Sequence, residues 1–118
     1  MMAFTATQTP RERKLGEATQ AASAYFGETI TSKFVLDKSK RKNVARARMW
    51  CMAYIRWRFP EMSQPQTARL FQKKDHTTVW NAERRARVLF PDAIFCLGDA
   101  DEVIGRIEAL GLGGADAA

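Results

Sequence analysis

The sequence has few of the residues on which catalysis and metal binding depend. It contains one histidine, His76, and two cysteines, Cys51 and Cys96, which stand far apart and form no CxxC pair. No serine or cysteine stands beside the histidine, and helical neighbours such as Asp75 and His76 point about 100° apart. We therefore expect no enzyme, no metal site and no cofactor, and we expect both cysteines to be buried, reduced thiols.

Long hydrophobic runs are also missing. No apolar run approaches the roughly 20 residues needed to cross a bilayer, and residues 1–10 lack a basic segment followed by an apolar one. We therefore expect a cytoplasmic protein without membrane contact. The apolar fraction of 46% and the charged fraction of 27% are ordinary for a globular protein, and 118 residues suffice for one domain with a hydrophobic core.

Positive charge is concentrated in the first 90 residues. They hold 18 of the 19 lysines and arginines but only 7 of the 13 acidic residues, a net charge of +11, whereas residues 91–118 carry −5. We expect a basic helical domain over 1–90 and, over 91–118, an acidic C-terminal helix with a flexible Gly/Ala tail, packed on the same domain. The basic part requires a polyanionic partner, and nucleic acid, an anionic membrane surface or an acidic protein would each satisfy that requirement.

The periodicity of the sequence predicts an all-α helical bundle. Apolar residues recur at helical spacing, proline and glycine mark the segment ends, and the alternation typical of strands is missing. We expect helices over 10–27, 39–59, 64–71 and 75–90, a helical turn within 28–38, and a last short helix that includes Val103, Ile104, Ile107 and Leu110. Apolar residues on two sides of 39–59 are typical of a central helix. The short helix, the turn at 72–75 and the helix after it predict a helix-turn-helix over about 63–90.

Six basic residues cluster at the start of the predicted central helix, between Lys38 and Arg48. Positive side chains there oppose the helix dipole, which favours negative charge at the amino end. A bound phosphate backbone would explain an arrangement that otherwise lowers stability, and backbone amides at a helix start also bind anions. A solvated charged segment without a ligand is the alternative.

Short polar side chains gather at the start of the helix 75–90. The segment consists of Lys73, Lys74, Asp75, His76, Thr77 and Thr78. In helix-turn-helix proteins, the second helix presents such residues to base edges in the major groove while the first helix crosses the backbone. Aspartate accepts a hydrogen bond from a cytosine amino group, and threonine bonds a base or contacts a thymine methyl group. Alternatively, Asp75 is only a helix cap and His76 only a surface residue.

Taken together, the two segments resemble a known DNA-binding family. The chain is similar to the C-terminal DNA-binding domain of the bacterial chromosomal replication initiator, DnaA, in two motifs, Val44-Ala45-Arg46-Ala47-Arg48 and Asp75-His76-Thr77-Thr78-Val79. The similarity covers about residues 19–89. It implies an all-helical domain of the Trp-repressor-like type, in which the fourth helix enters the major groove of a short asymmetric DNA box.

The resemblance also implies roles for individual residues. Arg46 would reach the minor groove, and Arg48 would contact the backbone. Pro65 in the third helix would touch bases, the triplet 75–77 would contact base edges in the major groove, and Thr78 would bind a phosphate. The further DNA contacts that we expect are Lys73, Lys74 and Asn81.

The chain departs from the family in three respects. Gln72-Lys73-Lys74 replaces the glycine-rich turn before the aspartate, so we expect another turn shape, because the freedom of glycine at positive φ is missing. Trp80-Asn81 replaces the usual Leu-His, which would change a DNA contact or serve a partner. No G-x-x-x-x-G-K-[ST] phosphate loop is present, so we expect no ATP-driven origin opening.

These inferences predict a sequence-specific regulator that binds double-stranded DNA at the nucleoid. We expect a free-standing transcriptional regulator, similar to the initiator-like domains of prophages and gene-transfer systems. A modulator of replication initiation that competes for initiator boxes is the alternative. Because a DNA-binding domain has no output of its own, either role implies a protein partner in the transcription or replication machinery. An interaction protein that works mainly through its Trp-rich surface or its acidic end is a further alternative.

Overall fold

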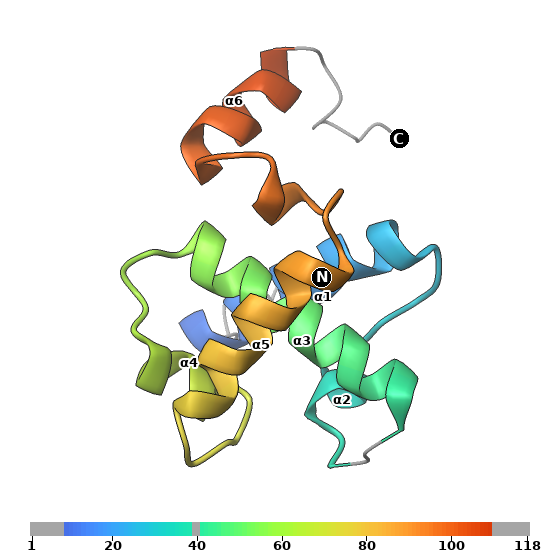
Figure 1. Ribbon diagram of the computed structural model, residues 1–118, viewed down its shortest axis with the longest axis vertical. Helices are drawn as coiled ribbons and strands as arrows, with labels where there is room; N and C mark the ends of the chain where they lie inside the picture. The colour runs from blue at the N-terminus through green and yellow to red at the C-terminus, as the bar shows by residue number, and fades with distance from the viewer. Residues whose placement is uncertain (1–8, 39–40, 110–118) are drawn as a thin grey trace.

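The structure, a computed structural model, describes residues 9–38 and 41–109. Every regular element in these residues is a helix. The elements in chain order are α1 (Pro10–Phe26), α2 (Ser32–Leu36), α3 (Lys42–Arg58), α4 (Gln64–Leu70), α5 (Thr77–Leu89), the 3-10 turn η2 (Ile94–Cys96) and α6 (Ala100–Ala109) (Figure 1). The predicted all-α class is confirmed. The described part of the chain does not include Leu110, the Gly/Ala tail or the side chain of Ile107.

Local capping signals set the ends of α1 and α4. The backbone N–H of Glu12 donates to Thr9 Oγ1 at 3.1 Å, and the backbone N–H of Thr9 donates to the Glu12 carboxylate at 2.8 Å. Ser63 and Gln66 form the same capping box at the start of α4, with distances of 3.2 and 2.8 Å. Gly27 ends α1 with a left-handed φ of 71°. These local interactions therefore fix both ends of α1 and the start of α4.

Two helices begin later than the sequence predicts. α3 begins at Lys42 rather than near residue 39, and Arg41 at its cap position makes no side-chain capping bond. α5 begins at Thr77 rather than at Asp75, because the Asp75 carboxylate accepts the backbone N–H of Thr77 at 2.9 Å. A side chain that caps the backbone two residues ahead holds its own residue outside the helix.

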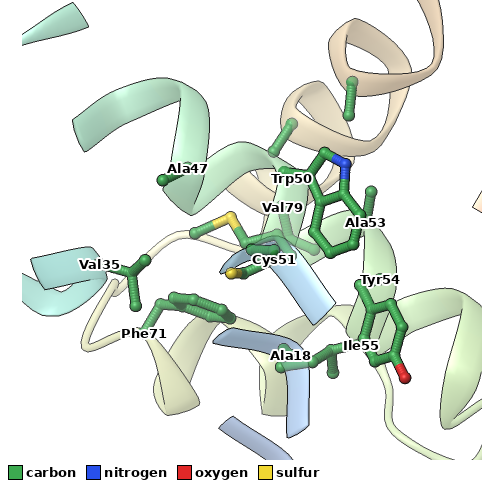
Figure 2. Close-up of a cluster of buried hydrophobic side chains, with 14 of the residues drawn as sticks. Ala18, Val35, Ala47, Trp50, Cys51, Ala53, Tyr54, Ile55, Phe71 and Val79 are labelled. Carbon is green, nitrogen blue, oxygen red and sulfur yellow. The ribbon is translucent and has the colours of Figure 1, made fainter. Parts of the chain in front are cut away.

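α3 supplies the centre of the hydrophobic core. Trp50, Cys51 and Ile55 are almost fully buried in it. Phe71, at the end of α4, and Val79, in α5, belong to the same cluster (Figure 2). The expected position of this helix at the centre of the bundle is therefore confirmed.

Aromatic side chains connect α3 to the chain beyond α5. The ring of Trp50 packs 5.6 Å from that of Tyr54 and 5.2 Å from that of Phe95 in η2, measured between centroids. The half-buried Trp57 donates its indole N–H to the carbonyl of Gly98 at 2.6 Å. Beyond these contacts, α6 lies at the end of the molecule opposite α2 and the turn before α5 (Figure 1).

α5 crosses α3 in the most extensive contact between two helices of the described chain. Val79, Ala82 and Ala86 form its buried side. Phe90, rather than Leu89, completes that side, since Leu89 is 45% exposed. The opposite side is exposed and carries Thr77, Trp80, Asn81, Arg84, Arg85 and Arg87.

The turn between α4 and α5 closes α4 without a glycine. Gln72 adopts a positive φ of 59°. Its backbone N–H donates to the Arg69 carbonyl at 3.0 Å, and the Lys73 N–H donates to the Ala68 carbonyl at 2.8 Å. This is the Schellman pattern, which glycine usually provides. The glutamine thus takes the backbone conformation that we expected to be missing from this turn.

Replacing Gln72 with glycine should raise the free energy of unfolding by about 0.5–1 kcal/mol. A residue with a Cβ loses about 1–2 kcal/mol in the left-handed region, and the greater freedom of glycine in the unfolded chain offsets part of the gain. Urea denaturation measures the change. Gln72→Ala keeps the Cβ and is the matched control, expected to change stability by less than about 0.5 kcal/mol. Equal effects of the two variants would contradict the assignment of strain to this Cβ.

The two cysteines differ in exposure, which corrects the expectation that both are buried. Cys51 is fully buried, and burial raises its pKa to about 12. Cys96 is half-buried. A thiol reagent should therefore label Cys96 in the folded protein and Cys51 only after unfolding. In a Cys96→Ser variant, the remaining thiol is Cys51. Rapid labelling of this variant without denaturant would contradict the burial of Cys51 in the core.

Candidate nucleic-acid interface

α4 and α5 form a helix-turn-helix whose orientation is fixed by contacts with α3. Glu83 of α5 accepts a hydrogen bond from Arg56 Nε of α3 at 3.1 Å and one from Gln64 Nε2 of α4 at 3.4 Å. Arg56 also donates to the carbonyl of Met62, just before α4, at 2.5 Å. Because the Glu83 side chain is only 12% exposed, solvent screens its ion pair with Arg56 weakly. The ion pair joins α3 to α5, and the hydrogen bond from Gln64 adds α4.

The amino end of α5 presents four exposed polar side chains, those of residues 75–78. The Asp75 carboxylate accepts the N–H of Thr77, and the N–H of Thr78 donates to the Asp75 carbonyl at 3.2 Å. Hydrogen bonds from Thr77 lower the pKa of Asp75, so this exposed carboxylate stays ionised at neutral pH. The capping role that we weighed for Asp75 is therefore present, and its contact with a base stays a prediction.

A groove of about 290 Å³ lies between the amino-terminal half of α3 and α5. Its polar lining residues are Arg48, Lys73, Thr78, Asn81 and Arg85, and its apolar lining residues are Ala45, Met49, Met52 and Ala82. Four of the ten residues that we predicted to contact DNA therefore meet in one place. Arg85 was not among them. The available signal was its spacing, since it follows Thr78 by seven residues, about two helical turns.

The groove is strongly positive. Partial burial lowers the pKa of the Lys73 amino group, and the nearby charges of Arg48 and Lys38 lower it further. None of the described residues that line the groove is acidic. Positive charges gathered in this way repel one another, and an anion placed between them would relieve the repulsion.

Arg48 also has a structural role that the resemblance does not imply. Its Nε donates to the Val35 carbonyl at 2.9 Å, and its Nη2 donates to the Asp37 carbonyl. These bonds tie the carboxyl end of α2 to α3. Partial burial lowers the pKa of the guanidinium, although the charge of Asp37 acts in the opposite direction.

The other predicted contacts lie on the outer surface. Arg46, Pro65 and Lys74 are all exposed, Arg46 in the second turn of α3 and Pro65 in the first turn of α4. None of them lines the groove. The amino ends of α3 and α5 nevertheless lie toward the same end of the molecule, away from α6 (Figure 1). Ser39 and Lys40 of the basic segment fall outside the described residues.

His76 stands exposed at the cap position of α5 and makes no capping hydrogen bond with its side chain. Across residues 9–38 and 41–109, no three His, Cys, Asp or Glu side chains are grouped so as to hold a metal ion. No helix in the described part of the chain has the length and apolar character needed to span a bilayer.

Two helices joined by a tight turn, with exposed polar residues at the start of the second and a positive groove beside them, define a helix-turn-helix DNA-binding domain. The family model of the bacterial dnaA protein helix-turn-helix matches residues 19–86, more than half of the chain, and the protein belongs to this family. The resemblance inferred from the two motifs is thereby confirmed, and double-stranded DNA is the ligand class of such domains. No curated protein and no solved structure matches the chain significantly.

Two arginines of the same motif should differ in their effect on stability. Arg48→Ala should lower the free energy of unfolding by about 1–3 kcal/mol, because the carbonyls of Val35 and Asp37 lose the hydrogen bonds that the Arg48 side chain donates. Arg46→Ala removes an exposed side chain on the same helix and should change stability by less than about 0.5 kcal/mol. Chemical denaturation of both variants measures the difference. A small effect of both substitutions would show that Arg48 does not hold α2 in place.

Proposed function

We propose that the protein is a regulator that binds a specific double-stranded DNA box by inserting the amino end of α5 into the major groove. The observation that carries the proposal is the exposed tetrad 75–78 beside the positive groove between α3 and α5. Membership of the DnaA-type helix-turn-helix family supports the same ligand.

The proposed contacts divide between bases and phosphates. Asp75, His76 and Thr77 contact base edges, and the hydrogen bond from the Thr77 N–H holds the Asp75 carboxylate at the start of α5. Thr78 binds a phosphate at the start of α5. Arg46 enters the adjacent minor groove. The remaining contacts from our predictions, made to the backbone or to nearby bases, are Arg48, Pro65, Lys73, Lys74 and Asn81.

The distribution of charge favours this orientation on DNA. Residues 1–90 carry +11 and residues 91–118 carry −5. α6, whose first turn holds Asp101 and Glu102, lies at the end of the molecule away from the amino ends of α3 and α5 (Figure 1). The acidic part therefore stays clear of the phosphates while the basic part approaches them.

Specific binding can be tested with an initiator-type box and a scrambled duplex of equal length in mobility shifts. The box should bind more tightly. Arg46→Ala and Asp75→Asn should each weaken binding to the box by about tenfold to a hundredfold, whereas Lys73→Ala should weaken both duplexes alike. The asparagine retains an oxygen for the helix cap, so it separates base contact from folding. Equal, salt-sensitive binding of the wild-type protein to both duplexes would remove the proposed specificity.

We propose transcription as the process that the protein regulates, through a protein partner in the transcription machinery and at the nucleoid. Control of replication initiation, by competition for initiator boxes, is the second candidate, because the family is that of an initiator. Mapping the binding sites on the genome distinguishes the two roles. Sites near promoters are expected, and sites confined to the replication origin would favour the second role.

A further inference from the structure

The exposed side of α5 carries an arginine stacked on a tryptophan, one helical turn apart. Trp80 is 46% exposed, and the guanidinium carbon of Arg84 lies 4.6 Å from the centroid of its ring. That distance is well within the range of about 6 Å over which a cation is attracted to an aromatic face. Neither residue is needed for the core, since Val79, Ala82 and Ala86 form the buried side of the helix.

The pair follows the proposed base-contacting tip along the helix. Thr77, Trp80 and Arg84 are spaced by three and four residues, which places them on one side of α5. At 1.5 Å per residue, Arg84 lies about 10 Å beyond Thr77 along the helix axis. The major groove is about 12 Å wide, so a helix that enters it by its amino end brings this position to the groove edge, where the phosphates lie.

Around Trp80 and Arg84 the chemistry of α5 matches a polyanion better than a protein, since the exposed apolar residues of this helix, Val88 and Leu89, lie further toward its carboxyl end. The exposed side of α5 carries Arg84, Arg85 and Arg87. The only acidic residue of α5, Glu83, is half-buried and paired with Arg56. An exposed tryptophan surrounded by unopposed positive charge is typical of surfaces that contact nucleic acid.

We infer that Trp80 and Arg84 form a clamp for a phosphate at the edge of the major groove. Arg84 binds the phosphate, and Trp80 is a positioning residue that holds the guanidinium plane. A guanidinium that packs its face against a ring keeps its edge N–H groups for other partners, and these groups suit a phosphate. This inference rests on the proposed function, because it requires α5 in the major groove, but the phosphate contact itself requires no particular sequence.

A double-mutant cycle tests the clamp. Arg84→Ala should weaken binding to the box and to the scrambled duplex alike, by about tenfold, and should reduce the slope of log affinity against log salt by about one. Trp80→Ala removes no charge and should weaken binding about two- to fivefold. The double variant should bind no more weakly than Arg84→Ala alone, because the tryptophan acts through the arginine. Trp80→Phe, which retains an aromatic face, should recover much of the loss.

Arg87→Ala is the matched control for charge. It removes the same charge from the exposed side of the same helix but about 5 Å further along the axis. Among the described residues, no aromatic ring packs against the guanidinium of Arg87. Its effect on affinity should be clearly smaller than that of Arg84→Ala. Equal effects of the two substitutions would reduce the clamp to general electrostatic attraction and overturn it.

Tryptophan fluorescence provides a second measurement. Trp50 is 1% exposed and Trp57 is half-buried, so an added quencher reports mainly on Trp80. Quenching by acrylamide should decrease when either duplex is added, and this decrease should be largely lost in Trp80→Phe. Unchanged quenching would overturn the clamp, since Trp80 would then remain open to solvent in the complex.

The remaining outcomes separate the clamp from the proposed function. Additive effects of the two alanine substitutions would show that Trp80 does not act through Arg84. Unchanged DNA affinity in both variants would leave this surface for a protein partner. Either result overturns the clamp, while specific binding to the box stands. Equal binding of the wild-type protein to both duplexes overturns the specificity, yet the cycle still measures the phosphate contact. A wild-type protein that binds neither duplex overturns both proposals.

Discussion

The packing of α5 across α3 is the constraint on which the rest of the interface depends. The middle of each helix packs in the core, and the amino ends of both helices lie toward the same end of the molecule (Figure 1). Ala82 and Ala86 are buried along the contact, and their small side chains let the helices approach closely. The ion pair between Arg56 and Glu83 fixes their relative orientation. A change in the crossing would move the arginines at the start of α3 away from the tip of α5 without altering either helix.

Local chemistry was sufficient to predict most of the fold. The caps at Thr9 and Ser63 and the glycine after α1 depend only on neighbouring residues, and the apolar spacing of α3 and α5 indicated which sides are buried. The failures occurred where tertiary geometry decides. Gln72 takes a positive φ because the turn must bring α5 onto α3, and this requirement outweighs the preference of glutamine.

The sequence predicted many residues of the candidate site but not how they are arranged in space. Spacing and residue type identified the tip residues 75–78 as exposed, because both depend on one helix. The groove was not predictable, since it exists only where α3, the turn and α5 meet, and Arg85 joins it for that reason. The intramolecular bonds of Arg48 to α2 were missed for the same reason, because α2 comes close to that residue only in the folded chain.

Features that lower stability gather at the end of the molecule proposed to contact DNA. α1 and α4 begin with capping boxes, whereas the cap residue of α3, Arg41, makes no side-chain capping bond, and the first turn of α3 holds no acidic residue. Lys73 stands close enough to Arg48 and Lys38 for their charges to lower its pKa. A negative charge at the start of α3 and between these cations would reduce the unfavourable electrostatic energy of both features. The strain at Gln72 has a different cause, because it comes from the backbone and no anion would relieve it. The electrostatic features therefore indicate the ligand, and the backbone strain reflects only the geometry needed to present α5 to it.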